Sequence, residues 1–215
     1  MLPPSTILFD LDGTLIDSVD LIIDSYHHTF RQHGLALTSR EELIEGIGTP
    51  LVAVFGRMTD QRATIDSWIA TYREFNLAHH DTRVRAFPGV VEMVNQLHAQ
   101  GRTLGVVTSK NNAGARRGLR LIGLEEHMSV VVGADDVTRH KPDPEPVERA
   151  LASLGVSAEH TIFIGDSHHD VASGKAAGVR TIAVSWGPIS RERLALAEPD
   201  HLCGSVEDVL AALGS

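Results

Sequence analysis

The chain has 215 residues, a length that fits one domain or one domain carrying a smaller insertion. Its 19 basic and 28 acidic residues give a formal charge of −9, which argues against binding to a nucleic-acid backbone, because that interaction needs a basic face. The single cysteine excludes an internal disulfide, and no apolar run approaches the roughly 20 residues of a membrane span, so we expect a cytoplasmic protein without nucleic-acid or membrane partners.

Five short apolar runs along the chain predict buried strands. They are nearly continuous in hydrophobicity and rich in β-branched side chains, which is typical of parallel strands covered on both faces. The runs cover residues 6–9, 103–107, 129–132, 161–164 and 179–184.

Segments with helical spacing fill the intervals between these runs. The apolar positions of residues 90–97 fall on one helical face, and Gly101 is placed to end that helix. Ser205 followed by Asp208 predicts a capped final helix. Three further segments each end before a glycine, at residues 113–122, 146–154 and 171–177. The alternation of strand and helix predicts an α/β fold with a Rossmann-like parallel sheet.

Residues 16–84 interrupt this alternation, because they contain no strand-like run. Apolar residues around Tyr26 and Tyr72 recur there at helical spacing. We therefore predict a small all-α insertion over these residues, after the first strand. The core domain would then be formed by residues 1–15 and 85–215.

Acidic, hydroxyl and basic side chains follow the predicted strands. The carboxyl ends of parallel strands meet at one edge of the sheet, where ligands bind in an open α/β fold, so we expect these side chains to converge. They are Asp10 and Asp12 after the first strand, Thr108, Ser109 and Lys110 after the second, Lys141 in a facing loop, and Asp166 and Asp170 after the fourth.

Carboxylates brought together in this way repel one another and raise each other's pKa, and a bound Mg²⁺ ion relieves the repulsion. A lysine and hydroxyl groups beside such an ion would hold a phosphate. One carboxylate can then attack phosphorus to give an aspartyl-phosphate, while a second acid protonates the leaving oxygen and later activates water. The pattern predicts phosphate chemistry on a small-molecule phosphate substrate, with Mg²⁺ as the cofactor.

The same residues resemble the haloacid dehalogenase superfamily over essentially the whole chain. Four segments match its motifs in order: FDLDGTLIDS at 9–18, VTSK at 107–110, KP at 141–142 and IGDSHHD at 164–170. The resemblance implies a phosphatase with an α/β core and a small helical cap. Dehalogenases of the superfamily lack the acid at the position of Asp12, so its presence favours phosphoryl transfer.

The resemblance also implies roles for single residues. Asp10 would be the nucleophile and Asp12 the general acid/base. Mg²⁺ would be held by the side chains of Asp10 and Asp166 and by the Asp12 carbonyl, with Asp170 as support for the metal site. The substrate-binding residues that it implies in the core are Thr108 and Lys141 for the phosphoryl group, with Gly13 and Ser109 beside them.

The helical insertion at residues 16–84, which the resemblance identifies as the cap, contains no lysine. Relatives that form a Schiff base, and hexose-phosphate mutases of similar fold, carry a lysine in the cap, so the sequence disfavours both chemistries. A sugar-phosphate mutase stays the alternative reading, together with a non-catalytic phosphate-binding module.

Segments of the cap resemble two groups of enzymes that act on different substrates. Gly48 and Thr49 lie in a segment similar to the specificity loop of phosphoglycolate phosphatases. Arg73, with the pair His79 and His80, lies in segments similar to certain bacterial pyrophosphatases, where these side chains would contact a second phosphate. The sequence leaves phosphoglycolate, pyrophosphate and other small phosphates open, and it is compatible with a monomer or a homodimer.

Overall fold

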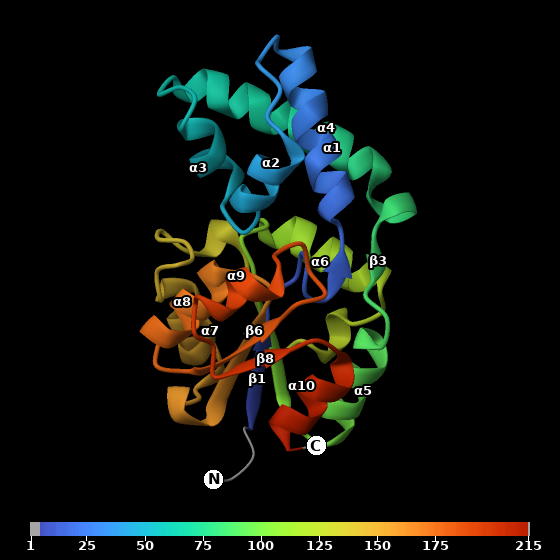
Figure 1. Ribbon diagram of the computed structural model, residues 1–215, viewed down its shortest axis with the longest axis vertical. Coiled ribbons are helices and arrows are strands. Elements are labelled where there is room, and N and C mark those ends of the chain that lie inside the picture. Colours follow the sequence, from blue (N-terminus) through green and yellow to red (C-terminus); the bar gives the residue numbers. More distant parts are fainter. Residues whose placement is uncertain (1–4, 215) are drawn as a thin grey trace.

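The computed structural model describes residues 5–214, which fold around one six-stranded parallel sheet (Figure 1). The strands lie in the order β5 (Val130–Val132), β4 (Thr103–Val107), β1 (Thr6–Phe9), β6 (Thr161–Gly165), β7 (Arg180–Val184) and β8 (His201–Cys203). The predicted α/β class is confirmed. Residues 1–4 and 215, which the predicted core domain includes, lie outside the described residues.

Strand β1 occupies an inner position between β4 and β6. Ile7 lies opposite Leu104 on one side and Ile162 on the other, and all four residues of β1 are buried. Burial on both faces explains why this strand has no alternation of polar and apolar residues. Strand β8 was missed by the sequence analysis, because its three residues run from exposed His201 to buried Cys203 and give no apolar run.

Helices cover both faces of the sheet. They are α5 (Val90–Ala99), α6 (Asn112–Leu121), α7 (Glu145–Leu154), α8 (His168–Ala176), α9 (Arg191–Ala195) and α10 (Val206–Leu213), with 3₁₀ turns at Glu125–His127, Ala134–Asp136 and Ala158–His160. Ile7 and Phe9 pack in a cluster with residues of α5, α6 and α10, whereas Leu8 packs on the other face with residues of α7. The predicted capping box of Ser205 and Asp208 is confirmed at α10.

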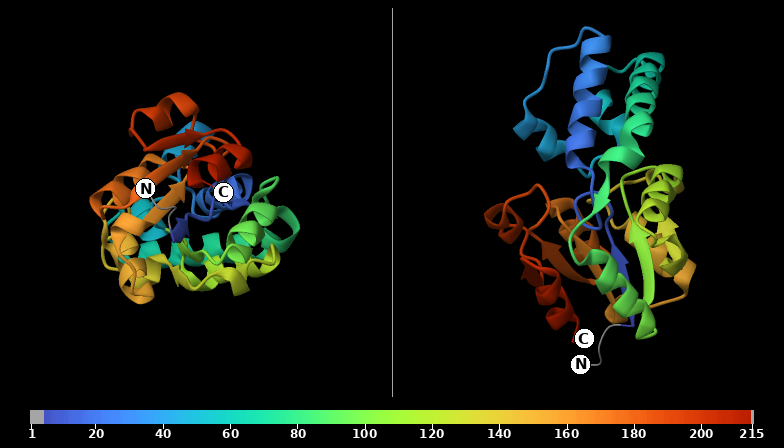
Figure 2. Two further views of the ribbon diagram at one scale, coloured as in Figure 1. Left: turned by 90° about the horizontal axis from the view of Figure 1, so that it is seen from below. Right: turned by 90° about the vertical axis from the view of Figure 1, so that its right-hand side faces the viewer.

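A group of helices stands over one edge of the sheet, as the right-hand view of Figure 2 shows. It contains α1 (Val19–Gln32), α2 (Arg40–Gly46), α3 (Leu51–Gly56) and α4 (Arg62–Arg83). These helices have their own apolar cluster, in which the ring of Tyr26 contacts those of Phe30, Phe55 and Tyr72. The helical group is therefore stabilised by packing that is separate from the sheet.

The connection between the two parts is a pair of short antiparallel strands. Strand β2 (Ile16–Asp17) pairs with β3 (Arg85–Ala86), so that Ile16 lies opposite Ala86. The prediction of a segment without strands from residue 16 onward was wrong at this point, because two residues are too few to give a periodic signal. Across residues 5–214, no helix combines the length and the apolar character needed to cross a bilayer.

Candidate active site

The first strand and its two neighbours bring the predicted site residues together. Asp10 follows β1, Thr108 follows β4 and Asp166 follows β6, and β1 lies between the other two. Parallel strands end at the same edge, so these three side chains meet there although they are far apart in the sequence. All three are buried.

The ammonium group of Lys141 links two carboxylates at this edge. Its Nζ donates to Asp10 Oδ1 at 2.9 Å and to Asp170 Oδ1 at 2.5 Å, and all three side chains are buried. Burial acts to lower the pKa of Lys141, but the two carboxylates outweigh it and raise that pKa above its usual value. Burial raises the pKa of Asp10 to about 7, while Lys141 acts in the opposite direction. The lysine is therefore charged, and it only partly compensates the acids around it.

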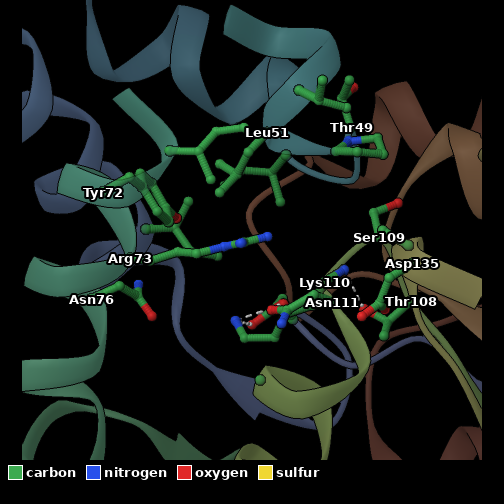
Figure 3. A pocket seen from close by; sticks show the side chains of 18 of the residues that line it. Thr49, Leu51, Tyr72, Arg73, Asn76, Thr108, Ser109, Lys110, Asn111 and Asp135 are labelled. Atoms are coloured by element: carbon green, nitrogen blue, oxygen red, sulfur yellow. Dashed lines mark hydrogen bonds and ion pairs between the residues drawn. The ribbon is translucent and has the colours of Figure 1, made fainter. Parts of the chain in front are cut away.

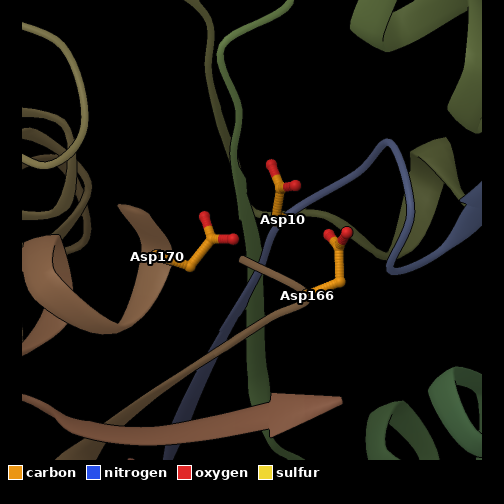
Figure 4. A group of neighbouring side chains, drawn as sticks. All are labelled: Asp10, Asp166 and Asp170. Carbon is orange, nitrogen blue, oxygen red and sulfur yellow. The ribbon is translucent and has the colours of Figure 1, made fainter. Parts of the chain in front are cut away.

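Asp166 supplies a third buried carboxylate. Thr14 Oγ1 donates to its Oδ1 at 2.9 Å, whereas its buried Oδ2 has no hydrogen-bond partner among residues 5–214. Burial, together with the charges of Asp10 and Asp170, raises the pKa of Asp166. One carboxylate oxygen from each of the three acids lies within 4.8 Å of the others, and Figure 4 shows the three side chains gathered at the strand ends. The cluster fits a divalent cation, which would satisfy the orphaned oxygen and offset the charge.

Asp170 is the third member of this cluster. The sequence analysis predicted that it would support the metal site. Both of its oxygens already accept hydrogen bonds, Oδ1 from Lys141 and Oδ2 from the Ser167 hydroxyl at 2.6 Å. Among residues 5–214, Asp166 keeps an oxygen without a partner and Asp170 does not.

Glycines allow the chain to close tightly around Asp166. Gly13 has φ = 91°, and a Cβ placed on it would lie 2.3 Å from Asp166 Oδ2. A Cβ on Gly187 would lie 2.6 Å from Asp166 Cβ. Gly13, which the sequence analysis assigned to substrate binding, thus also has a packing reason to lack a side chain.

Asp12 lies apart from the buried cluster, at the wall of a cavity. Ser18 Oγ donates to its Oδ1 at 2.6 Å, and Lys110 Nζ contacts its two oxygens at 2.9 and 3.1 Å. The side chain of Asp12 therefore faces the space that a substrate would enter and is separate from the three clustered carboxylates. Lys110 received no role from the sequence, although its position directly after Thr108 and Ser109 placed it beside the site.

The cavity has a volume of about 640 Å³ and lies between the sheet edge and the helices α1–α4. Its wall includes Asp10, Asp12 and Thr108 from the sheet side and Thr49 and Arg73 from the helical side. Arg73 is exposed, and Figure 3 shows its guanidinium reaching from α4 into the cavity toward Lys110. Among residues 5–214, no carboxylate pairs with Arg73, so its charge is available to a ligand.

Ser109 connects the two sides of the cavity directly. Its hydroxyl donates to the carbonyl of Gly48, a residue with φ = 91° in the loop before α3. Two residues that the sequence analysis assigned to substrate binding are thus in contact with each other. Their hydrogen bond closes one side of the cavity.

The two members of the predicted histidine pair line different cavities. His80 is buried and lines the main cavity, whereas His79 lines a second hollow of about 490 Å³ on the other side of α4. Adjacent residues of a helix diverge by about 100°, so they cannot share one site. The sequence analysis also missed Asp81, which accepts from Arg117 Nε at 2.9 Å and Nη2 at 3.0 Å.

Comparisons with known proteins agree with this geometry. A profile of the family described as haloacid dehalogenase-like hydrolase matches residues 7–184. Pyrophosphatase PpaX from Halalkalibacterium halodurans is 43% identical to the chain over 210 residues, covering 98% of this chain and 97% of that protein, and the protein of the same name from Anoxybacillus flavithermus gives the same values.

A crystal structure described as a predicted phosphatase, from Clostridium acetobutylicum, has a TM-score of 0.88 at 25% identity and covers 98% of both chains. Another, described as a predicted phosphoglycolate phosphatase from Haemophilus somnus 129pt, has a TM-score of 0.84 at 25% identity and covers 99% of both. The chain therefore belongs to the haloacid dehalogenase-like hydrolases.

Proposed function

We propose that this hydrolase is a Mg²⁺-dependent inorganic pyrophosphatase that transfers one phosphoryl group to Asp10. The observation that carries the proposal is the unpaired guanidinium of Arg73 in the cavity that Asp10 and Asp12 also line. A substrate with a second phosphate presents an anion to that cation while its first phosphate lies at Asp10. The 43% identity to proteins named pyrophosphatase PpaX supports the same substrate.

Mg²⁺ would be held by the carboxylates of Asp10 and Asp166 and by the carbonyl of Asp12. The Asp166 Oδ2 atom, which has no partner among residues 5–214, supports this assignment, since a cation there would compensate the cost of burying a carboxylate oxygen without a donor. Bound there, the ion would offset the charge of the acids and of the phosphoryl oxygens, so that two anions can approach each other. Asp170 would keep Lys141 in place.

The protein's own groups would carry out the covalent and proton-transfer steps. A carboxylate oxygen of Asp10 would attack phosphorus, and the bond from phosphorus to the bridging oxygen would break as the aspartyl-phosphate forms. Asp12, protonated at this stage, would give its proton to the departing phosphate. It would then take a proton from the water that attacks the aspartyl-phosphate, which releases the second phosphate and restores Asp10. Lys141 and Thr108 would bind the phosphoryl oxygens throughout.

A phosphoglycolate phosphatase is the second candidate. The observation that favours it is the loop of Gly48 and Thr49, which lines the same cavity as Arg73. The carboxylate of phosphoglycolate would also pair with that guanidinium. Both substrates thus have an anion at each end, and the length and charge of the distal group distinguish them.

The test is a comparison of kcat/KM for pyrophosphate, phosphoglycolate and a hexose phosphate in the presence of Mg²⁺. We expect pyrophosphate to give the highest value, and Asp10→Asn, which keeps the size of the side chain, to remove turnover of all three. A higher kcat/KM for phosphoglycolate would replace the first candidate by the second. Formation of an isomerised hexose phosphate without free phosphate would indicate a mutase, and no turnover of any phosphate would indicate a binding module.

A further inference from the structure

We propose that Arg117, Asp81 and His80 form a relay that positions the cavity face of α4, and through it the group that binds the distal end of the substrate. The inference rests on the proposed function, because it concerns the anion that Arg73 would hold. None of these three residues would touch the phosphoryl group that is transferred. They are positioning residues.

The relay joins the helical part to the sheet part of the molecule. Asp81 lies in the last turns of α4, and Arg117 lies on α6, the helix that begins just after the Thr108–Lys110 loop. Their contact is bidentate, from Arg117 Nε to Asp81 Oδ1 at 2.9 Å and from Nη2 to Oδ2 at 3.0 Å. A fork of two parallel hydrogen bonds fixes direction as well as distance, so α4 has a defined orientation relative to α6 at this end.

His80 transmits this orientation to the cavity. Its Nδ1 lies 2.8 Å from Asp81 Oδ1, and its ring is buried in the cavity wall. Burial lowers the pKa of His80, and the nearby Lys110 and Arg117 lower it further, against the opposing effect of Asp81. The imidazole is therefore neutral at pH 7, and it donates its Nδ1–H to Asp81. Its Nε2 has no partner within residues 5–214 and lies near Gly118 of α6, where a Cβ would be 3.9 Å away.

The side chains that face the substrate lie on the same side of α4 as His80. Arg73, Asn76 and His80 follow one another at helical spacing, and all three line the cavity. Asn76 is fixed in turn, since its Nδ2 donates to Ser25 Oγ at 3.1 Å while the Ser25 hydroxyl donates to Leu21 O. A change in the angle of α4 at Asp81 would move Arg73 over the cavity, because a helix transmits a rotation of one end along its length.

The experiment is a double-mutant cycle on the relay with two substrates. Arg117→Met and Asp81→Asn should each raise KM for pyrophosphate by about three- to tenfold, a modest effect because the ion pair is exposed, and leave kcat within about twofold. The double variant should be no worse than either single variant, and Arg117→Lys, which keeps the charge but not the fork, should recover part of the loss. KM for 4-nitrophenyl phosphate, whose leaving group carries no second anion, should change less.

Asp24→Asn is the matched control. Asp24 also holds an arginine of α4, Arg83, at 2.7 Å, but this ion pair joins α4 to α1 and does not reach α6. The Asp24→Asn variant should leave KM for pyrophosphate unchanged. Unchanged KM in Arg117→Met and Asp81→Asn, additive effects in the double variant, or an equal effect of Asp24→Asn would each overturn the relay. Failure of the proposed function looks different, since the unmodified protein would then prefer phosphoglycolate to pyrophosphate or would not hydrolyse pyrophosphate at all.

Discussion

Lys141 Nζ lies 2.9 Å from Asp10 Oδ1, and both side chains are almost completely buried. The same ammonium contacts Asp170, so a single positive charge serves two buried carboxylates. A buried charge that loses its partner is strongly destabilising, whereas an exposed one is not. This contact is therefore a support of the fold as well as a part of the candidate site.

Replacement of Lys141 by Met tests that statement on stability. The variant keeps the apolar stem and removes the charge, so Asp10 and Asp170 lose their shared partner. We expect the free energy of unfolding, measured by urea denaturation without Mg²⁺, to fall by about 3–5 kcal/mol. Lys175→Met is the control, because Lys175 is exposed and, within the described part of the chain, donates only to the carbonyl of Ala197. A loss below about 1 kcal/mol in Lys141→Met would contradict the assignment.

Asp166 provides a test of metal binding that does not depend on turnover. Mg²⁺ at about one hundred times its dissociation constant should raise Tm of the unmodified protein by roughly 5 °C or more, since it binds only the folded state. Asp166→Asn should abolish this shift, because the amide replaces the unpartnered carboxylate oxygen. Asp20→Asn, in an exposed ion pair with Arg40, should keep it. An unchanged Mg²⁺ shift in Asp166→Asn would place the ion elsewhere. Chelation should also remove activity, and added Mg²⁺ should restore it.

Arg73 should determine affinity for the distal anion of the substrate. A charge-assisted hydrogen bond contributes about 1.5–3 kcal/mol, so Arg73→Met should lower kcat/KM for pyrophosphate by about 10- to 100-fold. The matched control is Arg62→Met, because Arg62 lies on the same helix and lines the same cavity but is paired with Asp66. Equal losses in both variants would show that the cavity needs positive charge in general and not Arg73 in particular.

Cys203 should be unreactive in the folded protein. It is buried, and burial raises the pKa of its thiol from 9.0 to about 11, with a further contribution from Asp208. The thiolate is the reactive form, so at pH 8 the folded chain should react with a thiol reagent about 100-fold more slowly than the urea-unfolded chain. Its rate should rise about tenfold for each unit from pH 8 to pH 10, while the unfolded chain levels off near pH 9. Equal rates in the two states would show that the thiol is accessible.

The parts of the site that follow strands could be predicted from the sequence. Asp10, Thr108 and Asp166 each stand directly after a buried run, and the parallel arrangement of such runs fixes that their ends meet. The same logic failed for β8, where three residues of mixed burial leave no apolar run.

The contacts made by the helices over the sheet could not be predicted in the same way. The rotation of α4 decides that His80 and not His79 lines the main cavity, and rotation depends on packing against α1 and α6. Asp81 and Arg117 are 36 residues apart and belong to none of the four motifs, so their spacing does not predict an ion pair. Lys110 is the last residue of the VTSK motif, but its contact with Asp12 depends on a fold that brings together residues 98 positions apart.

The inner position of β1 has a consequence for how the protein is made. Strand β1 is synthesised before the other strands of the sheet, yet Lys141 follows its partner Asp10 by 131 residues, and Asp166 follows its partner Thr14 by 152 residues. A nascent or truncated chain that ends before residue 166 contains Asp10 but lacks the other two of the three clustered acids, Asp166 and Asp170. An ion at this cluster would therefore bind only when most of the polypeptide has been synthesised, and its binding would indicate that the central strands have assembled.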